Sequence, residues 1–484
     1  MPEVPAVPEP VSLARQVAKA FADDGPLSAA MPAFEPRSGQ RQMAAAAAET
    51  FEHGGVLLAE AGSGTGKTLA YLVPAILSGH RVLISTGTKN LQDQIFYKDL
   101  PALREALGLN FRATYMKGRG NYLCVHRFEQ LRQEEGTPPR TAAEYGTLEQ
   151  LAEWMVQTET GDRAEVEDLP DNLNLWSEIS ATSENCIGTE CPKYQECFVT
   201  QMRQRAAEAN VVIVNHHLLC ADAAVRQSAY GEVIPGCTFA VIDEAHQLED
   251  VATQYFGVAV SNHRLDELNR DGHRLLPEDV VASDRALSEL HQLLGRVQES
   301  ARTFFELIML TSVSTERQRM TAETVAPFAE PGQMLIRNLD DVARALSRLD
   351  ESSEDLVALG RRASEIRDQL TFLLEVNDRE FVYFLELRGR GIVLRASPID
   401  VSAFVRELLL DRMQGTILTS ATLTVDDSFN YVRGRLGVVD AHELRLPSEF
   451  NYQEQAILYL PRGMPDPRQP RFAEAVAEQV VELL

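Results

Sequence analysis

Five short apolar runs along the chain have the pattern of strands that are buried on both faces of a parallel sheet. They are rich in Val, Ile and Leu and too short for helices, so strands are the favoured interpretation. The runs are VLLAE at 56–60, RVLIST at 81–86, NVVIVN at 210–215, FAVIDEAH at 239–246 and GTILTSATL at 415–423. They predict an α/β domain whose single parallel sheet is interrupted by two long inserts.

The two predicted inserts differ in character. The first, 112–205, contains four of the six cysteines, and its charges are divided: five bases and one acid from 112 to 132, then eleven acids and one base from 144 to 184. The second, 251–390, has apolar positions at helical spacing in stretches such as LSELHQLLGRV and EIRDQLTFLLEV. It therefore predicts a helical subdomain.

The composition is that of a globular protein with several domains. The chain has 484 residues, of which 44% are hydrophobic and 24% charged, and one domain per ~150 residues is typical. The net charge of −25 excludes a uniformly basic protein that wraps nucleic acid. Because charges are screened over ~8 Å at physiological salt, a local basic strip can still bind DNA.

The sequence has no pattern of a secretory signal or a membrane span. The first ten residues, MPEVPAVPEP, hold four prolines and no base, and they predict a disordered tip. No apolar stretch approaches the ~20 residues that cross a bilayer. Six cysteines are too few for a disulfide framework in a chain of this length. We therefore expect a cytoplasmic protein with reduced thiols and no membrane partner.

The sequence AGSGTGKT at 61–68 lies between a predicted strand and a helical pattern, which is the order of a phosphate-binding loop. In such a loop the backbone amides face the β-phosphate, Lys67 reaches the β and γ oxygens, and Thr68 binds Mg²⁺. The predicted backbone contacts come from Gly62, Ser63, Gly64, Thr65 and Gly66. Ala61 replaces the first glycine of the strict pattern, and a plain glycine turn is the alternative. The flanking strand and helix favour a nucleotide site.

Asp243, Glu244, Ala245 and His246 stand at the end of another predicted strand. A carboxylate in this position can hold the Mg²⁺ of a nucleotide, while its neighbour orients or deprotonates the attacking water. An acidic helix cap is the alternative. Paired with Lys67, the tetrapeptide predicts an ATPase in which Asp243 binds the metal and Glu244 the water.

Four cysteines form a candidate metal site. Cys124, Cys186, Cys191 and Cys197 are separated by 61, 4 and 5 residues, and four thiolates can hold either a Zn²⁺ ion or an iron-sulfur cubane. Zinc sites usually have closely spaced pairs, so the isolated first cysteine favours iron and sulfur. Core packing is the alternative, but SENCIGTECPKYQEC is polar. The other two, Cys220 and Cys237, are predicted core residues.

Bases and aromatic residues alternate just before the first of these cysteines. Lys117, Arg119 and Arg127 stand among Tyr115 and Tyr122, and such a mixture offers phosphate contacts and stacking faces for a single strand. A solvated helix whose bases pair with the following acid-rich stretch is the alternative. We expect Lys117, Arg119 and Tyr122 to contact nucleic acid.

Eight motifs stand in the order of a known family. They are FEPRSGQRQM (34–43), AGSGTGKT, TGTKNLQDQ (86–94), KGRGNYLC (117–124), the three later cysteines, NHHLL (215–219), DEAH (243–246) and TSATL (419–423). In this order the chain resembles the XPD/DinG iron-sulfur DNA helicases of superfamily 2, and within them the bacterial DinG-like branch. The resemblance covers nearly the whole chain except the proline-rich start.

The resemblance implies an ATP-dependent helicase with Mg²⁺ and a [4Fe-4S] cluster that moves 5′ to 3′ on single-stranded or forked DNA. It places Arg37 and Gln40 at the adenine, His246 in the nucleotide site, and Thr88 and Gln92 near the DNA backbone. It also implies that 420–422 couples hydrolysis to movement.

The implied fold is an α/β RecA-like motor domain that carries an iron-sulfur domain and a helical Arch domain as inserts. The expected segments are 1–111 (motor domain 1, first part), 112–205 (iron-sulfur domain), 206–250 (motor domain 1 with DEAH), 251–390 (Arch), 391–447 (motor domain 1, last part) and 448–484 (start of an incomplete motor domain 2).

Two motifs of the family's second lobe, resembling GSFWEGID and QGxGRxIR, do not occur in the 484 residues. Only AILYLP at 456–461, a predicted strand, and the helical stretch 471–484 follow the first lobe. Arginine fingers contribute ~10³ to 10⁵ in rate in related enzymes. We therefore expect an amino-terminal part of a helicase that hydrolyses ATP weakly on its own.

The leading hypothesis is an ATP-dependent DNA helicase of repair or replication. The competing hypothesis is a non-enzymatic iron-sulfur module that binds DNA or senses redox state and retains some nucleotide affinity. RNA remains open as a substrate because backbone contacts do not read bases. The sequence indicates no protein partner.

Overall fold

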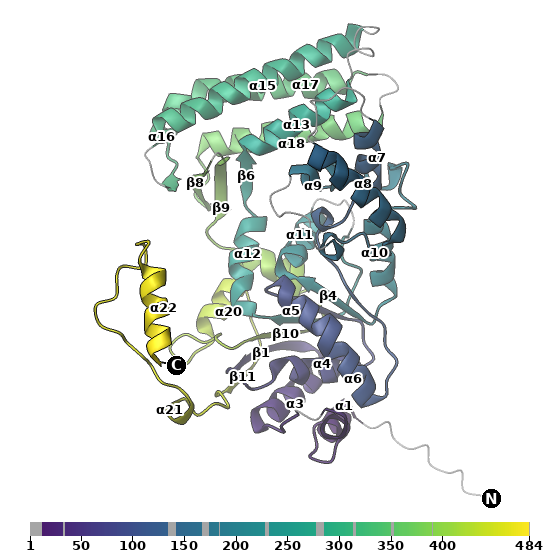
Figure 1. Ribbon diagram of the computed structural model, residues 1–484, viewed down its shortest axis with the longest axis vertical. Helices are drawn as coiled ribbons and strands as arrows, with labels where there is room; N and C mark the ends of the chain where they lie inside the picture. Colours follow the sequence, from purple (N-terminus) through teal and green to yellow (C-terminus); the bar gives the residue numbers. More distant parts are fainter. Residues whose placement is uncertain are drawn as a thin grey trace, which may run out of the picture.

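The computed structural model describes residues 12–31, 34–133, 142–166, 174–182, 184–227, 232–276, 285–312, 316–349, 353–389 and 391–483. The predicted disordered tip at 1–10 lies outside these ranges. A parallel-sheet domain forms the lower half of the molecule, and the two inserts lie above it, the long helices of the second at the top (Figure 1). None of the helices in the described part is both long and apolar enough to cross a membrane.

The central sheet has seven strands in the order β11-β1-β10-β5-β2-β4-β3, and every neighbouring pair is parallel. The strands are β1 (Gly55–Ala61), β2 (Val82–Thr86), β3 (Ala113–Tyr115), β4 (Val211–Asn215), β5 (Phe239–Asp243), β10 (Gly415–Ser420) and β11 (His442–Leu446). All five strands predicted for this sheet are present. The sequence patterns missed β3 and β11, which are the two edge strands.

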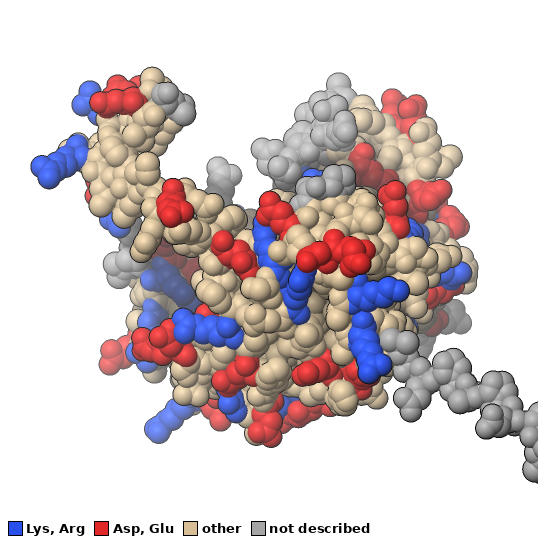
Figure 2. Space-filling view, turned by 90° about the horizontal axis from the view of Figure 1, so that it is seen from below, with Lys and Arg blue, Asp and Glu red and all other residues tan. Residues whose placement is uncertain are grey.

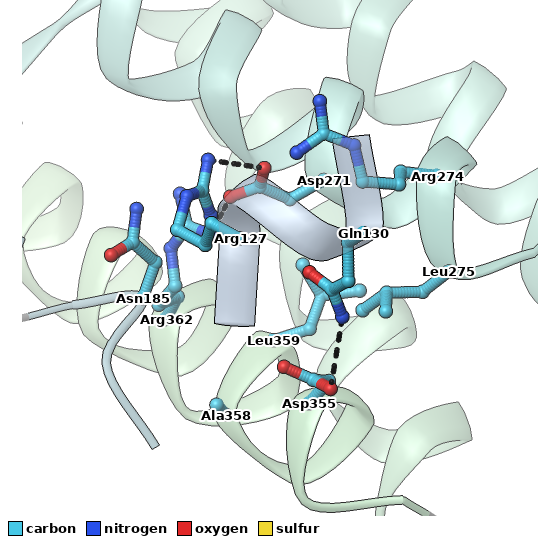
Figure 3. A pocket seen from close by; sticks show the side chains of 10 residues that line it. All are labelled: Arg127, Gln130, Asn185, Asp271, Arg274, Leu275, Asp355, Ala358, Leu359 and Arg362. Carbon is cyan, nitrogen blue, oxygen red and sulfur yellow. Dashed lines mark hydrogen bonds and ion pairs between the residues drawn. The ribbon is translucent and has the colours of Figure 1, made fainter. Parts of the chain in front are cut away.

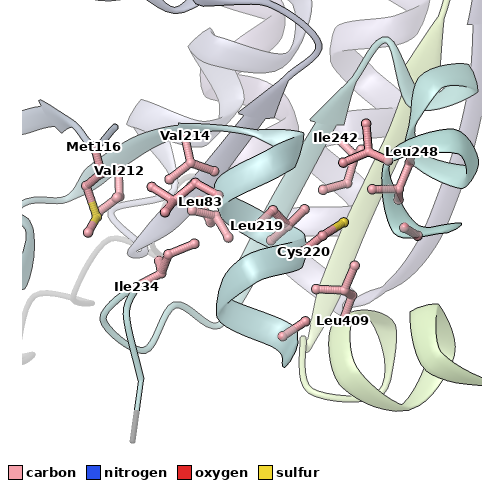
Figure 4. Packing of buried hydrophobic residues seen from close by; sticks show 14 of the residues in the cluster. Leu83, Met116, Val212, Val214, Leu219, Cys220, Ile234, Ile242, Leu248 and Leu409 are labelled. Atoms are coloured by element: carbon pink, nitrogen blue, oxygen red, sulfur yellow. The ribbon is translucent and has the colours of Figure 1, made fainter. Parts of the chain in front are cut away.

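Helices cover both faces of this sheet. Alternate residues of a strand point to opposite faces, so Leu57 packs with α1 (Leu13–Ala20), α3 (Ser38–His53) and α4 (Lys67–Leu77), whereas Leu58 belongs to the core on the other face. Figure 4 shows that second core, where Leu83, Val212 and Ile242 of the sheet meet Leu219 and Cys220 of α11 (His216–Gln227). Cys220 is fully buried, as predicted.

The first insert leaves the sheet after β3 and returns to it at β4. Its helices are α7 (Val125–Gln133), α8 (Ala142–Gln157), α9 (Asn174–Ile179) and α10 (Phe198–Glu208). Because β3 pairs with β4, the predicted boundary at residue 112 lies too early and the insert begins after Tyr115.

The second insert has its own hydrophobic core. Its main helices are α13 (Asn262–Leu275), α15 (Arg285–Thr311), α17 (Ala329–Leu346) and α18 (Glu354–Glu375). It also contains an antiparallel sheet in the order β6-β9-β8-β7, formed by β6 (Val258–Ser261), β7 (Arg317–Arg319), β8 (Phe381–Arg388) and β9 (Gly391–Pro398). The predicted boundary at residue 390 is therefore wrong, because it divides the β8–β9 hairpin.

A polar joint connects the two inserts. Arg127 of α7 and Arg362 of α18 both bind the carboxylate of Asp271 on α13, at 3.3 and 2.6 Å, as Figure 3 shows. Burial raises the pKa of Asp271, but the two guanidinium groups outweigh it and hold the pKa below its usual value. At the same joint, Gln130 donates to Asp355 at 3.5 Å. Interfaces of this polar kind between domains allow relative motion.

The end of the described chain lies apart from the sheet (Figure 1). The predicted strand at 456–461 is not a strand, and Ile457 is 95% exposed. The predicted last helix is present as α22 (Phe472–Leu483), but none of its residues is buried.

On the face seen in Figure 2, basic and acidic side chains are interspersed.

Candidate nucleotide and iron-sulfur sites

The phosphate loop connects β1 to α4 at the carboxyl edge of the sheet. Gly64 and Gly66 have φ values of +84° and +81°, a conformation that glycine adopts without the steric cost other residues meet. Thr65 donates its hydroxyl to the Gly62 carbonyl at 2.7 Å, and Lys67 Nζ donates to the Ala61 carbonyl at 3.3 Å. Lys67 therefore folds back along the loop, at the amino end of an eleven-residue helix.

The two residues predicted to contact adenine lie against this loop. Arg37 donates to the Gly64 carbonyl, and Gln40 Nε2 donates to the Gly66 carbonyl at 3.0 Å. The other amide atom, Gln40 Oε1, is buried and has no hydrogen-bond partner among the described residues. Since an unpaired buried acceptor is costly, this oxygen is a candidate acceptor for a ligand's amine.

Asp243 lies at the end of β5 and is almost fully buried. Its Oδ1 accepts from the Glu244 amide at 3.0 Å, and its Oδ2 accepts from the Tyr71 hydroxyl at 2.9 Å. Burial raises its pKa to about 6, and the charge of Glu244 adds to this, whereas Tyr71 and Lys67 act in the opposite direction. Lys67 and Asp243 are thus close enough to interact. A buried carboxylate with a raised pKa favours a neighbouring cation.

Glu244 is held in a strained position beside the end of β10. Its φ of +57° puts a non-glycine residue in the left-handed region, at a cost of order 1–3 kcal/mol. Ser420 donates to its carboxylate at 3.1 Å, and His246 Nδ1 lies 2.8 Å from the same serine hydroxyl. The Asp-Glu-Ala-His tetrapeptide and the TSATL segment are therefore directly connected.

Sequence reasoning missed two buried residues at this site. Tyr71 lies four positions after Lys67, so it is on the same helix face, and this spacing was a usable signal. His216 Nδ1 lies 2.7 Å from the Ser85 hydroxyl, and its Nε2 lies 3.4 Å from the Glu244 carbonyl. Burial lowers the pKa of His216 to about 4, so it is neutral at pH 7.

Replacing Asp243 with asparagine is expected to stabilise the metal-free protein at pH 8 by about 1–3 kcal/mol. The folded protein keeps this proton up to about pH 6, whereas the unfolded chain loses it near 3.8, so the destabilisation builds up between these two values and is complete above about pH 6. Thermal unfolding in EDTA should show a higher midpoint for Asp243→Asn at pH 8, a smaller difference at pH 4.5 and almost none at pH 3. A variant less stable than the wild type at pH 8 would contradict this electrostatic account.

The four predicted cluster ligands lie in the first insert near one another. Cys124 directly precedes α7, Cys197 directly precedes α10, and Cys191 follows a 3₁₀ turn. Burial raises the pKa of the Cys124 thiol to about 11, and charge on Cys186 and Cys197 raises it further. The same two neighbours also raise the pKa of Cys191, after burial.

An iron-sulfur cluster at these cysteines stays a prediction. No group of three or more His, Cys, Asp or Glu side chains in the described ranges could hold one metal ion. Arg203 interacts with Cys186 and Cys197 and supplies positive charge beside them.

The residues predicted to contact DNA divide into buried and exposed ones. Lys117 is buried and pairs with Asp162 at 2.7 Å, and Tyr122 accepts the Lys117 amide at 3.1 Å. Gln92 is also buried and donates to the Met116 carbonyl. Direct DNA contact by these three does not fit their burial. Lys117 instead pairs with the acid-rich stretch, as the alternative interpretation predicted for these bases, because Asp162 belongs to that stretch.

Two predicted DNA contacts remain accessible. Thr88 is exposed and caps α5 (Lys89–Gln94) by accepting from the Leu91 amide at 3.3 Å. Arg119 is partly exposed in the turn before Tyr122.

A parallel sheet whose carboxyl edge unites a phosphate loop with an Asp-Glu-Ala-His tetrapeptide defines a nucleotide-driven motor of the DEAD/DEAH class. In agreement, a family model for DEAD/DEAH box helicases matches residues 39–155.

Comparison with known proteins gives the family more closely. The chain is 36% identical over 458 residues to the ATP-dependent DNA helicase YoaA of Escherichia coli, covering 94% of this chain and 71% of the relative. It is 34% identical over 469 residues to YoaA of Haemophilus influenzae, with 97% and 72% covered. It is 31% identical over 478 residues to the ATP-dependent helicase DinG of Mycobacterium tuberculosis, with 92% and 68% covered.

The chain belongs to the XPD/DinG family and is an ATP-dependent DNA helicase. The predicted family, fold class and helicase function are confirmed, and the non-enzymatic alternative is not favoured. Among solved structures, that of Xpd4 from S. tokodaii is 15% identical, with a TM-score of 0.41, and covers 85% of this chain and 61% of its own.

Proposed function

We propose that the chain binds ATP and Mg²⁺ between the phosphate loop and Asp243, and that it moves 5′ to 3′ along single-stranded DNA during repair or replication. One observation carries this proposal: Tyr71, on the helix that begins at Lys67, donates to Asp243 at 2.9 Å, which brings the phosphate loop and the Asp-Glu-Ala-His tetrapeptide together at the carboxyl edge of the sheet. A family member that is an ATP-dependent DNA helicase requires such a site.

In the proposed site, each residue has a distinct role. Lys67 binds the β and γ oxygens, and the loop amides of residues 62–66 surround the β-phosphate. Thr68 and Asp243 would hold Mg²⁺, which neutralises charge on the phosphate oxygens when bound. Glu244, fixed by Ser420, orients the attacking water and accepts its proton.

The base is proposed to lie beside Arg37 and Gln40. The unpartnered Gln40 Oε1 can accept a hydrogen bond from the exocyclic amine of adenine. Guanine presents an acceptor at the equivalent ring position, so this oxygen would favour ATP over GTP.

Cys124, Cys186, Cys191 and Cys197 are proposed to hold a [4Fe-4S] cluster. Such a cluster would join the loop before α7 to the segment before α10. Thr88 and Arg119 are proposed DNA contacts, and Lys117, Gln92 and Tyr122 would support that surface from within. Because basic and acidic side chains are mixed along the chain, attraction of the DNA phosphates depends on local bases, and Arg119 is one of these.

ATP hydrolysis with and without DNA tests the proposed function. Single-stranded DNA should stimulate hydrolysis, single-stranded RNA of the same sequence should do so less, and a fluorescent trap should detect movement toward the 3′ end. Hydrolysis that is unchanged by DNA, while nucleotide still binds, would contradict the proposal.

A further inference from the structure

Tyr71 links α4, the helix that carries Thr68, to Asp243, the other proposed magnesium ligand. Its ring is completely buried inside the motor domain, and its hydroxyl donates to Asp243 Oδ2 at 2.9 Å. Thr68 lies three positions before Tyr71 in the first turn of the same helix. Burial raises the pKa of Tyr71 well above its usual value, and the charge of Asp243 adds to this effect, so the phenol stays protonated as a donor.

The direction of this hydrogen bond suits metal binding. When Tyr71 donates to Oδ2, it stabilises the charged carboxylate, which is the form that binds a cation. A phenylalanine would fill the same volume, so the hydroxyl serves this contact rather than the packing.

The connection also spans separate elements. Thr68 belongs to α4, which follows β1, whereas Asp243 ends β5, and β10 lies between these two strands in the sheet. The register of β1 and β5 on β10 sets the positions of these strands, and the contact between Tyr71 and Asp243 adds a direct side-chain link between α4 and the end of β5.

We infer that Tyr71 is a positioning residue that holds Thr68 and Asp243 in the arrangement magnesium requires and thereby sets the Mg²⁺ dependence of nucleotide binding. This inference rests on the proposed nucleotide site. Tyr71 itself touches neither the phosphates nor the reacting water.

Tyr71→Phe tests the inference by removing one oxygen atom. Binding of a fluorescent ATP analogue is titrated with Mg²⁺, and the half-maximal Mg²⁺ concentration should rise ~10-fold, as expected for loss of a hydrogen bond to a charged group. Affinity measured in EDTA should change less than twofold, because the hydroxyl acts only through the metal ligands. Tyr431→Phe, at an exposed tyrosine of α20 (Asn430–Leu436), is the matched control and should behave as wild type.

A double-mutant cycle keeps the test independent of stability. If Tyr71 acts through Asp243, then adding Tyr71→Phe to Asp243→Asn should change the Mg²⁺ midpoint less than twofold further. An unchanged midpoint in Tyr71→Phe, or additive effects in the double variant, would overturn the inference. Lys67→Ala separates this inference from the proposed function. If the wild type binds the ATP analogue no more tightly than Lys67→Ala, the proposed nucleotide site fails, whatever the role of Tyr71.

Discussion

Glu244→Gln is expected to lower DNA-stimulated ATP hydrolysis ~10²- to 10³-fold while leaving ATP affinity within about threefold of wild type. The amide keeps the size of the side chain and can still accept from Ser420, but it cannot take a proton from water. The strained backbone at this residue and its contact with Ser420 indicate that the structure holds the carboxylate in one place.

The matched control for this variant is Glu299→Gln on the exposed surface of α15. It removes the same charge far from the loop and should leave the rate unchanged. Turnover of Glu244→Gln within threefold of wild type would remove Glu244 from the hydrolytic machinery and leave its contact with Ser420 as a structural one.

Cys191→Ser is expected to abolish the cluster. The wild-type protein should be brown, with broad absorbance near ~400 nm and about four iron atoms per chain, because cubane clusters have these properties. A serine oxygen is a harder donor than a thiolate and does not replace it well on iron. The variant should lose most of its iron and its colour.

Cys237→Ser is the control, since Cys237 packs against the hydrophobic core that contains Cys220 and is not one of the four predicted ligands. It should keep full colour. A colourless wild-type protein that carries one zinc ion would favour the zinc alternative, and retention of iron by Cys191→Ser would exclude that residue as a ligand.

The motor domain could be predicted because its central strands are buried on both faces. Strands β2, β5 and β10 have no exposed residue, so each leaves a continuous apolar run in the sequence. The edge strand β11 has the exposed sequence HELRL and leaves no such run. Strand β9 alternates buried and partly exposed residues, a weaker signal that escaped detection within a largely helical insert.

The site was predictable where its residues are consecutive in the chain. The phosphate loop and the Asp-Glu-Ala-His tetrapeptide carry their chemistry in a few adjacent letters. The pairing of Lys117 with Asp162 joins residues 45 positions apart, and no local pattern reveals that such a lysine is buried. For the same reason the contact between Tyr71 and Asp243, 172 positions apart, required the structure.

A crystal structure of the protein with Mg²⁺ and a non-hydrolysable ATP analogue tests the central claim most directly. The triphosphate should lie in the loop of residues 62–66, with Lys67 Nζ within hydrogen-bonding distance of a β or γ oxygen. The carboxylate of Asp243 should lie next to the metal ion. A nucleotide bound away from this loop, or a metal that reaches the phosphates without Thr68 and Asp243 beside it, would contradict the account.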